Sequence, residues 1–196
     1  MKKILYGLFC LILANYGCSP GTPTVIILQP LGNYSEMQTM QIRDGLIKFY
    51  GIKICVAKNT PLPGTAYYKP LNRYSANLLL QFLSAKKDTA YTIIGLTNQD
   101  IFTAKNNNLH WGVMGLGTLN ADASIVSSFR LHHDARLYDE LVKLSAHELG
   151  HNFGLHHCPD KTCIMADAEG HNNFYRETGF CVNCRKKLLD IGVMIR

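Results

Sequence analysis

Apolar residues follow two different periods in the first hundred positions of the chain. Three runs of nearly continuous apolar character predict buried strands at residues 24–28, 51–57 and 90–96. Between them, residues 35–50 and 73–84 repeat apolar positions at helical spacing, and Ser35 is a suitable N-cap for the first helix. Strands that alternate with helices in this way predict an α/β domain with a mostly parallel sheet.

The pattern changes after residue 100. Residues 111–116 and 123–129 are short apolar segments joined by a turn-rich stretch, which predicts a hairpin at the edge of the sheet. Residues 134–151 then return to helical spacing, with leucines at positions 137, 141, 144 and 149. We expect this helix to pack against the sheet through its leucines and to present its other side chains outward.

The amino terminus differs in kind from the rest of the chain. Lys2 and Lys3 precede an apolar run over residues 4–14, which is too short to cross a bilayer and is typical of a secretory signal. Cys18 follows this run directly after a glycine, as the lipid-modified cysteine of bacterial lipoproteins does. The residues before it depart from the usual lipobox, so both a lipid anchor at Cys18 and a plain cleaved signal remain open.

These features divide the chain into a signal peptide at residues 1–18, a linker at residues 19–23 and one domain at residues 24–196. We expect an exported protein, in the periplasm or at the cell surface, that touches the membrane only through a lipid anchor.

Composition supports one self-sufficient domain. The 196 residues are 47% hydrophobic and 17% charged, which excludes a disordered chain or a coiled coil and predicts a monomer with its own core. The formal charge of +6 is modest, and the densest basic run, Arg185 to Lys187, is typical of a solvated helix face. We expect no nucleic-acid partner.

The helix predicted at residues 134–151 carries a metal-binding motif. His147 and His151 are four positions apart, which places both imidazoles on one face, where a zinc ion can bind them. Glu148 lies beside the first ligand and is the candidate general base, which takes a proton from a water on the metal as it attacks a polarised carbonyl.

A third ligand follows the helix. Gly154 can adopt the left-handed conformation that ends a helix, so the chain can turn and bring His157 back to the metal. The spacing favours His157 over its neighbour His156. The other histidines (His110, His132, His133 and His171) lie outside the motif, and we expect them at the surface or in satisfied core positions.

Four cysteines follow the third histidine at spacings typical of a metal site. Cys158 and Cys163 precede Met165, and Cys181 and Cys184 form a Cys-x-x-Cys pair. Four thiolates can close a tetrahedral structural zinc site. The remaining thiol of the domain, Cys55, lies in a predicted strand, and we expect it to pack in the core.

Together these residues resemble the signature of the archaemetzincins, a branch of the metzincin zinc peptidases. The resemblance spans nearly the whole predicted domain and includes Ile93 to Ile101 and Ser127 to Leu131. It implies a metzincin-like zincin fold of α/β class, with a twisted mixed sheet, an active-site helix and a small zinc-stapled C-terminal subdomain.

The resemblance also implies two zinc ions. His147, His151 and His157 would hold the catalytic one above the Met-turn residue Met165, and the four cysteines (Cys158, Cys163, Cys181 and Cys184) would hold the structural one. Because the chain carries an export signal, these cysteines could instead form two disulfides in an oxidising compartment, although their spacing favours zinc.

Metzincins bind an extended peptide antiparallel to the edge strand of the sheet, and here that strand is expected at residues 111–117. Its glycines, Gly112, Gly115 and Gly117, would allow close approach of a backbone, or would simply kink the strand. Tyr175 lies where some metzincins keep an assisting tyrosine, but packing in the core or at the surface is the favoured interpretation.

The sequence therefore predicts a zinc-dependent peptidase that acts on peptides or proteins. Two alternatives stay open at this stage. A zinc-stabilised binding scaffold without enzymatic activity would have no use for Glu148, and a zinc hydrolase of non-peptide substrates would share the same water-activating centre.

Overall fold

The computed structural model describes residues 25–86, 91–168 and 171–196. The predicted signal peptide, the lipid-anchor candidate Cys18 and the predicted linker lie outside these residues. Within the described part, no helix combines the length and apolar character that crossing a membrane requires.

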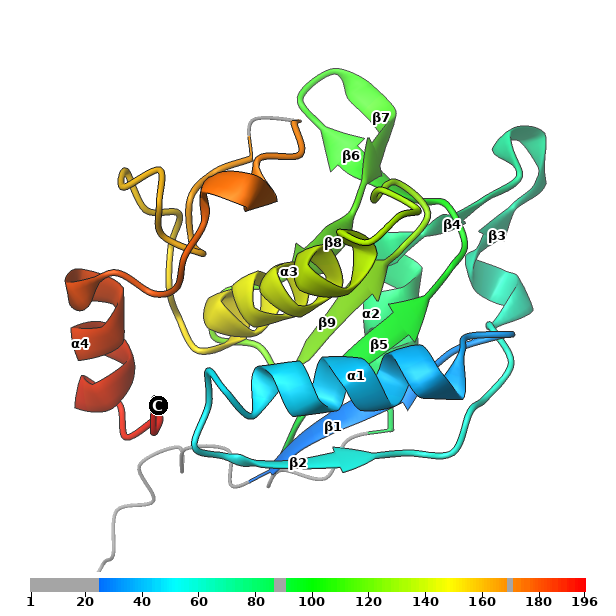
Figure 1. Ribbon diagram of the computed structural model, residues 1–196. Coiled ribbons are helices and arrows are strands. Elements are labelled where there is room, and N and C mark those ends of the chain that lie inside the picture. The colour runs from blue at the N-terminus through cyan, green and yellow to red at the C-terminus, as the bar shows by residue number, and fades with distance from the viewer. Residues whose placement is uncertain (1–24, 87–90, 169–170) are drawn as a thin grey trace, which may run out of the picture.

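The centre of the molecule is a five-stranded sheet of order β2-β1-β5-β9-β8 (Figure 1). Its strands are β1 (Val25–Pro30), β2 (Lys53–Val56), β5 (Tyr91–Thr97), β8 (Gly115–Gly117) and β9 (Ala123–Ser127). The first four in this order run parallel, and β8 pairs antiparallel with β9. The predicted mostly parallel sheet with an edge hairpin is therefore confirmed.

Three helices cover the two faces of this sheet (Figure 1). Helices α1 (Glu36–Leu46) and α3 (Leu137–Asn152) pack together on one face, and α2 (Ala76–Ser84) covers the other. The strands serve both faces because successive side chains alternate: Ile94 packs with the α1–α3 layer, and Ile93 with the α2 layer. Ser35 caps α1 as predicted, accepting a hydrogen bond at Oγ from the Gln38 amide (3.3 Å).

A second, smaller sheet has the order β3-β4-β6-β7. Its strands are β3 (Tyr67–Tyr68), β4 (Arg73–Ser75), β6 (Ile101–Lys105) and β7 (Asn108–Val113), and three short 3-10 helices lie outside both sheets: η1 (Gly64–Ala66), η2 (Lys69–Leu71) and η3 (Phe174–Arg176). Figure 1 shows the β6–β7 hairpin projecting from the main body.

Two predictions about this region are wrong. Residues 73–75 form β4 rather than the first turn of a helix, because the Tyr74 amide donates to the Asp100 carbonyl (2.9 Å) and Arg73 pairs with the Asp100 carboxylate (2.7 Å). The strand predicted at residues 111–116 is split between β7 and β8, which belong to different sheets. Both outcomes depend on pairing between distant segments, which helical or strand spacing does not reveal.

The chain beyond α3 forms the smaller C-terminal part, which includes helix α4 (Val182–Asp190) (Figure 1). It contains little regular structure but joins the main core, since Leu188 is fully buried and Phe180 packs edge-on to Tyr50 at 5.8 Å between ring centroids. This packing therefore fixes the cysteines of the C-terminal part, and the segment opposite α3, relative to the main sheet.

Candidate functional site

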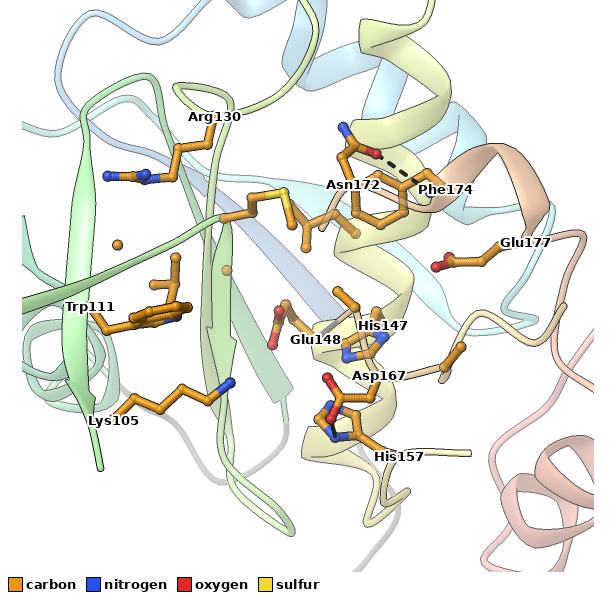
Figure 2. A pocket seen from close by; sticks show the side chains of 17 residues that line it. Lys105, Trp111, Arg130, His147, Glu148, His157, Asp167, Asn172, Phe174 and Glu177 are labelled. Atoms are coloured by element: carbon orange, nitrogen blue, oxygen red, sulfur yellow. Dashed lines mark hydrogen bonds and ion pairs between the residues drawn. The ribbon is translucent and has the colours of Figure 1, made fainter. Parts of the chain in front are cut away.

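Helix α3 places two histidines of the motif one turn apart on the same side. Leu141 and Leu149 bury the other side of the helix in the core, and His147 faces the cleft (Figure 2). Their Nε2 atoms lie 3.0 Å apart. The helix alone therefore supplies two ligand atoms directed at one point.

A tight turn returns the third histidine. Gly154 has a φ of +85°, and a Cβ atom there would lie 2.5 Å from Asn120 Oδ1, so glycine is required for both reasons. The ligand atoms of His147, His151 and His157 all lie within 4.8 Å of one another. His156 is exposed and does not belong to this group.

Hydrogen bonds set the tautomer of both helical histidines. His147 Nδ1 lies 2.7 Å from the Ile164 carbonyl and His151 Nδ1 lies 2.7 Å from the Leu155 carbonyl. Since a carbonyl oxygen only accepts, both Nδ1 atoms carry the proton and both Nε2 atoms present a lone pair. Burial lowers the pKa of His147 to about 3, which keeps this ring neutral.

This donor set fits a zinc ion. Two nitrogen lone pairs facing each other at 3.0 Å repel unless a cation lies between them, and ligands about 2 Å from one zinc are separated by about 3.3 Å. Neutral imidazoles bonded to carbonyls through Nδ1 are the usual form of zinc-binding histidine.

Glu148 lies beside these ligands, buried to 6% exposure between α3 and β8. Two strand glycines make room for it: a Cβ atom at Gly115 would lie 2.5 Å from Glu148 Oε1, and one at Gly117 would lie 2.6 Å from the Glu148 carbonyl oxygen. These glycines thus accommodate the carboxylate of this chain, a reason for them that the sequence did not suggest. Burial raises the pKa of Glu148 to about 8, opposed by a hydrogen bond from the Gly117 amide.

Met165 lies fully buried beneath the histidines. Its Sδ contacts the α3 backbone at Gly150, where any Cβ atom would collide with the sulfur. Gly150 is therefore the residue that lets the methionine pack under the two helical ligands.

Asp167 is a site residue that the sequence did not single out. Its Oδ2 lies 3.4 Å from Nδ1 of His157, so its carboxylate faces the third histidine (Figure 2). Its place two residues beyond Met165 is the only signal that could have identified it.

The site opens into a cleft of about 380 Å³ between two walls (Figure 2). One wall is the segment from Trp111 to Gly115, which crosses from β7 to β8, together with Lys105 and Arg130. The other is α3 with the segment after Met165, including Phe174 and Glu177.

The four cysteines converge on a second point. Their Sγ atoms all lie within 4.8 Å of one another, and each is a free thiol. Zinc ligands about 2.3 Å from the ion are about 3.8 Å apart, close to the 3.7 Å between Cys158 and Cys181 Sγ. The Met165 and Cys181 amides each donate to Cys163 Sγ at 3.4 Å, which suits a thiolate.

The remaining candidates lie elsewhere. Tyr175 is 72% exposed at the surface, with Arg176 over its ring at 5.1 Å from the centroid, and Cys55 is half-buried in β2 rather than in the core. His132 pairs with the buried Glu140 (2.5 Å), and His110 stacks on Tyr68 with ring centroids 4.8 Å apart.

Comparison with known proteins agrees with this arrangement. Residues 50–190 match the family model described as Peptidase family M54. The chain is 35% identical over 134 residues to an archaemetzincin of Methanopyrus kandleri, covering 67% of this chain and 74% of that protein. It is 30% identical over 166 residues to an archaemetzincin of Archaeoglobus fulgidus, covering 83% and 98%.

Solved structures give the same result. The M. kandleri archaemetzincin superposes with a TM-score of 0.74 at 28% identity, covering 91% of this chain and 98% of that one. The A. fulgidus archaemetzincin, in complex with malonate, gives a TM-score of 0.71 at 26% identity, covering 83% and 99%.

These features define the zinc metallopeptidases of metzincin type. They are a mostly parallel sheet, a helix on it that carries two histidines, a third histidine after a glycine turn, and a buried methionine. The family match narrows this class. The chain belongs to peptidase family M54, the archaemetzincins, and the resemblance noted in the sequence is confirmed. Membership of a peptidase family also removes support from the non-enzymatic scaffold.

Proposed function

We propose that this protein hydrolyses peptide bonds with zinc held by His147, His151 and His157 and with Glu148 as the general base. The observation that carries this proposal is the buried Glu148 carboxylate, which lies at the floor of the same cleft as the converging histidines. A purely structural metal site would not need, beside its ligands, a carboxylate that does not bind the metal.

Zinc bound there would polarise the substrate carbonyl and lower the pKa of a water toward neutrality. Glu148 accepts the proton of the attacking water on a carboxylate oxygen and passes it to the leaving amine nitrogen. A cation held by the histidines would oppose the effect of burial on the pKa of Glu148 and favour the ionised base.

The wall from Trp111 to Gly115 is the proposed binding surface for the substrate backbone. Strand β7 is an edge strand of the smaller sheet and β8 is an edge strand of the larger one, and they adjoin at Met114. Edge strands keep free amides and carbonyls that an extended peptide can pair with.

We further propose that Cys158, Cys163, Cys181 and Cys184 hold a second, structural zinc. This site supports the first one directly, since the Cys158 amide donates to the Met165 carbonyl (2.7 Å) and Cys158 follows His157 in the chain. The cysteines would thereby lock the segment that carries the third histidine and the methionine.

Digestion of a broad peptide library by the zinc-loaded protein, read by fragment masses, tests the activity. We expect cleavage that stops when a chelator removes the exchangeable zinc and returns when zinc is restored. Absence of cleavage by protein whose zinc content has been verified would refute peptide hydrolysis and favour a non-peptide substrate of the same centre.

A further inference from the structure

A second buried carboxylate in the cleft has no role in the proposed chemistry. Glu177 follows η3, is 4% exposed, and lines the wall opposite the edge strands. Figure 2 shows its carboxylate directed from its loop into the cleft, toward the space between Phe174 and His147. Its Oε2 atom is buried and has no hydrogen-bond partner among the described residues.

The nearest cation does not satisfy it. Lys143 of α3 is bound instead by the Asp139 carboxylate (2.7 Å) and by the Phe174 carbonyl (2.8 Å). No ion pair joins Lys143 to Glu177 within the part of the chain that the structure describes. A buried carboxylate oxygen without a hydrogen-bond partner raises the free energy of the fold. A ligand group that enters the cleft and donates a hydrogen bond to this oxygen therefore binds more favourably.

The cationic side chains of the opposite wall also have partners other than Glu177. Arg130 donates from Nε and Nη2 to the two Asp100 carboxylate oxygens, at 2.8 and 2.9 Å. Lys105 lies over the Trp111 ring, 5.4 Å from its centroid. Neither is bonded to Glu177, and the third acid of the cleft, Asp167, faces His157.

We propose that Glu177 selects a substrate with a lysine or arginine side chain at a residue flanking the scissile bond. This inference rests on the proposed peptidase activity and names its substrate class. Leu144 and Phe174, each 4% exposed, border the same pocket and offer an apolar surface for the aliphatic stem of such a side chain, while the cationic end reaches Oε2.

The electrostatics of the wall agree with this assignment. Burial raises the pKa of Glu177 to about 7, against the lowering effect of Lys143, and Asp139 raises it further. A cation from the substrate stabilises the ionised form and offsets the cost of burial, whereas a neutral side chain does not.

Matched peptides test the proposal. A peptide series with lysine, norleucine or glutamate at each position flanking the cleavage site separates charge from the apolar stem, because norleucine keeps the stem alone. We expect kcat/KM for the best lysine peptide to exceed that for its norleucine partner by at least roughly tenfold. Glu177→Gln should bring this lysine-to-norleucine ratio close to one. Glu177→Lys should make the glutamate peptide a better substrate than the lysine peptide.

Asp190→Asn is the matched control, since it removes one negative charge from an exposed ion pair with Lys186 in α4, and it should leave the ratio unchanged. The same peptides, titrated by fluorescence anisotropy against zinc-loaded Glu148→Gln protein, give the ratio without turnover. A lysine-to-norleucine ratio near one in both assays overturns the role of Glu177. A large binding ratio with no hydrolysis by the wild type overturns the peptidase proposal alone.

Discussion

Two buried carboxylates face one cleft in different settings. Glu148 is enclosed by the strand glycines and receives an amide hydrogen bond, whereas Glu177 keeps an unpartnered oxygen. Their different surroundings suit one to proton transfer and the other to recognition, and each difference can be measured by a single substitution.

Glu148→Gln should retain the catalytic zinc and lose activity by roughly a hundredfold to ten-thousandfold, because an amide cannot accept the proton of the attacking water. His151→Ala should lose both the exchangeable zinc and the activity. Zinc content by elemental analysis and hydrolysis of one peptide, measured on both variants, distinguish the two failures. Near-normal turnover by Glu148→Gln would contradict the general-base role.

Glu177→Gln should stabilise the fold at alkaline pH. The pKa of Glu177 is raised from 4.5 to about 7 in the fold, so its favourable contribution is complete below pH 4.5 and is lost as the pH rises through 7. Glutamine does not titrate, and the variant should gain on the order of 3 kcal/mol over the wild type at pH 8.

Denaturant unfolding of both proteins at pH 5 and pH 8 measures this difference, which should be small at the lower pH. An equal difference at the two pH values would show that the substitution acts through packing and not through charge.

At the scale of elements, the site depends on how α3 ends. The turn at Gly154 positions the third histidine, and Met165 packs against the same helix at Gly150. The ligand geometry therefore depends on the helix, its turn and the methionine together. The cysteine cluster, which follows the third histidine in the chain, supports this arrangement.

Gly154→Ala should destabilise the fold by about 1–2 kcal/mol and weaken binding of the exchangeable zinc, because alanine resists a φ of +85° and its Cβ meets Asn120. Gly179→Ala is the control, since nothing lies within 4 Å of the added atom. Thermal unfolding and competitive zinc titration report the two effects. Wild-type zinc affinity in Gly154→Ala would show that the turn does not position His157.

At the scale of the whole molecule, two clusters of candidate metal ligands lie on either side of one chain segment. Zinc at the histidines would bind at the open cleft, and zinc at the cysteines would bind where Cys163 and Cys184 are buried. The two ions should therefore differ in how readily they leave.

Purified protein should contain two zinc ions, one removed by a chelator under native conditions and one released only on unfolding. Elemental analysis before and after chelation counts them. One zinc per chain, together with no reactive thiols at the four cysteines after denaturation without reductant, would show disulfides in place of the second site.

Export and lipid attachment stay predictions, because they rest on residues outside those described. If Cys18 is acylated, labelled palmitate should enter the wild type and not Cys18→Ser. Equal labelling of both proteins, or none of the wild type, would contradict the anchor, and full-length chain in the cytosol would contradict export.

The sequence by itself determined the features that depend on neighbours along the chain. Four-residue spacing places His147 and His151 on one helical face, and a glycine three positions later allows the turn to His157. The four parallel strands of the main sheet were also predictable, because parallel strands covered on both faces are nearly continuously apolar, whereas the antiparallel edge strand β8 was not.

Only the tertiary structure decided which distant residues meet in the cleft. Asp100, next to β6, binds Arg73 of β4 and Arg130 beyond β9, and Glu148 fits because β8 offers glycines where it meets α3. Glu177 faces the histidines from thirty residues along the chain, with no spacing rule to indicate it. Such contacts arise from packing between segments, and a local period in one segment carries no information about the partner it will meet.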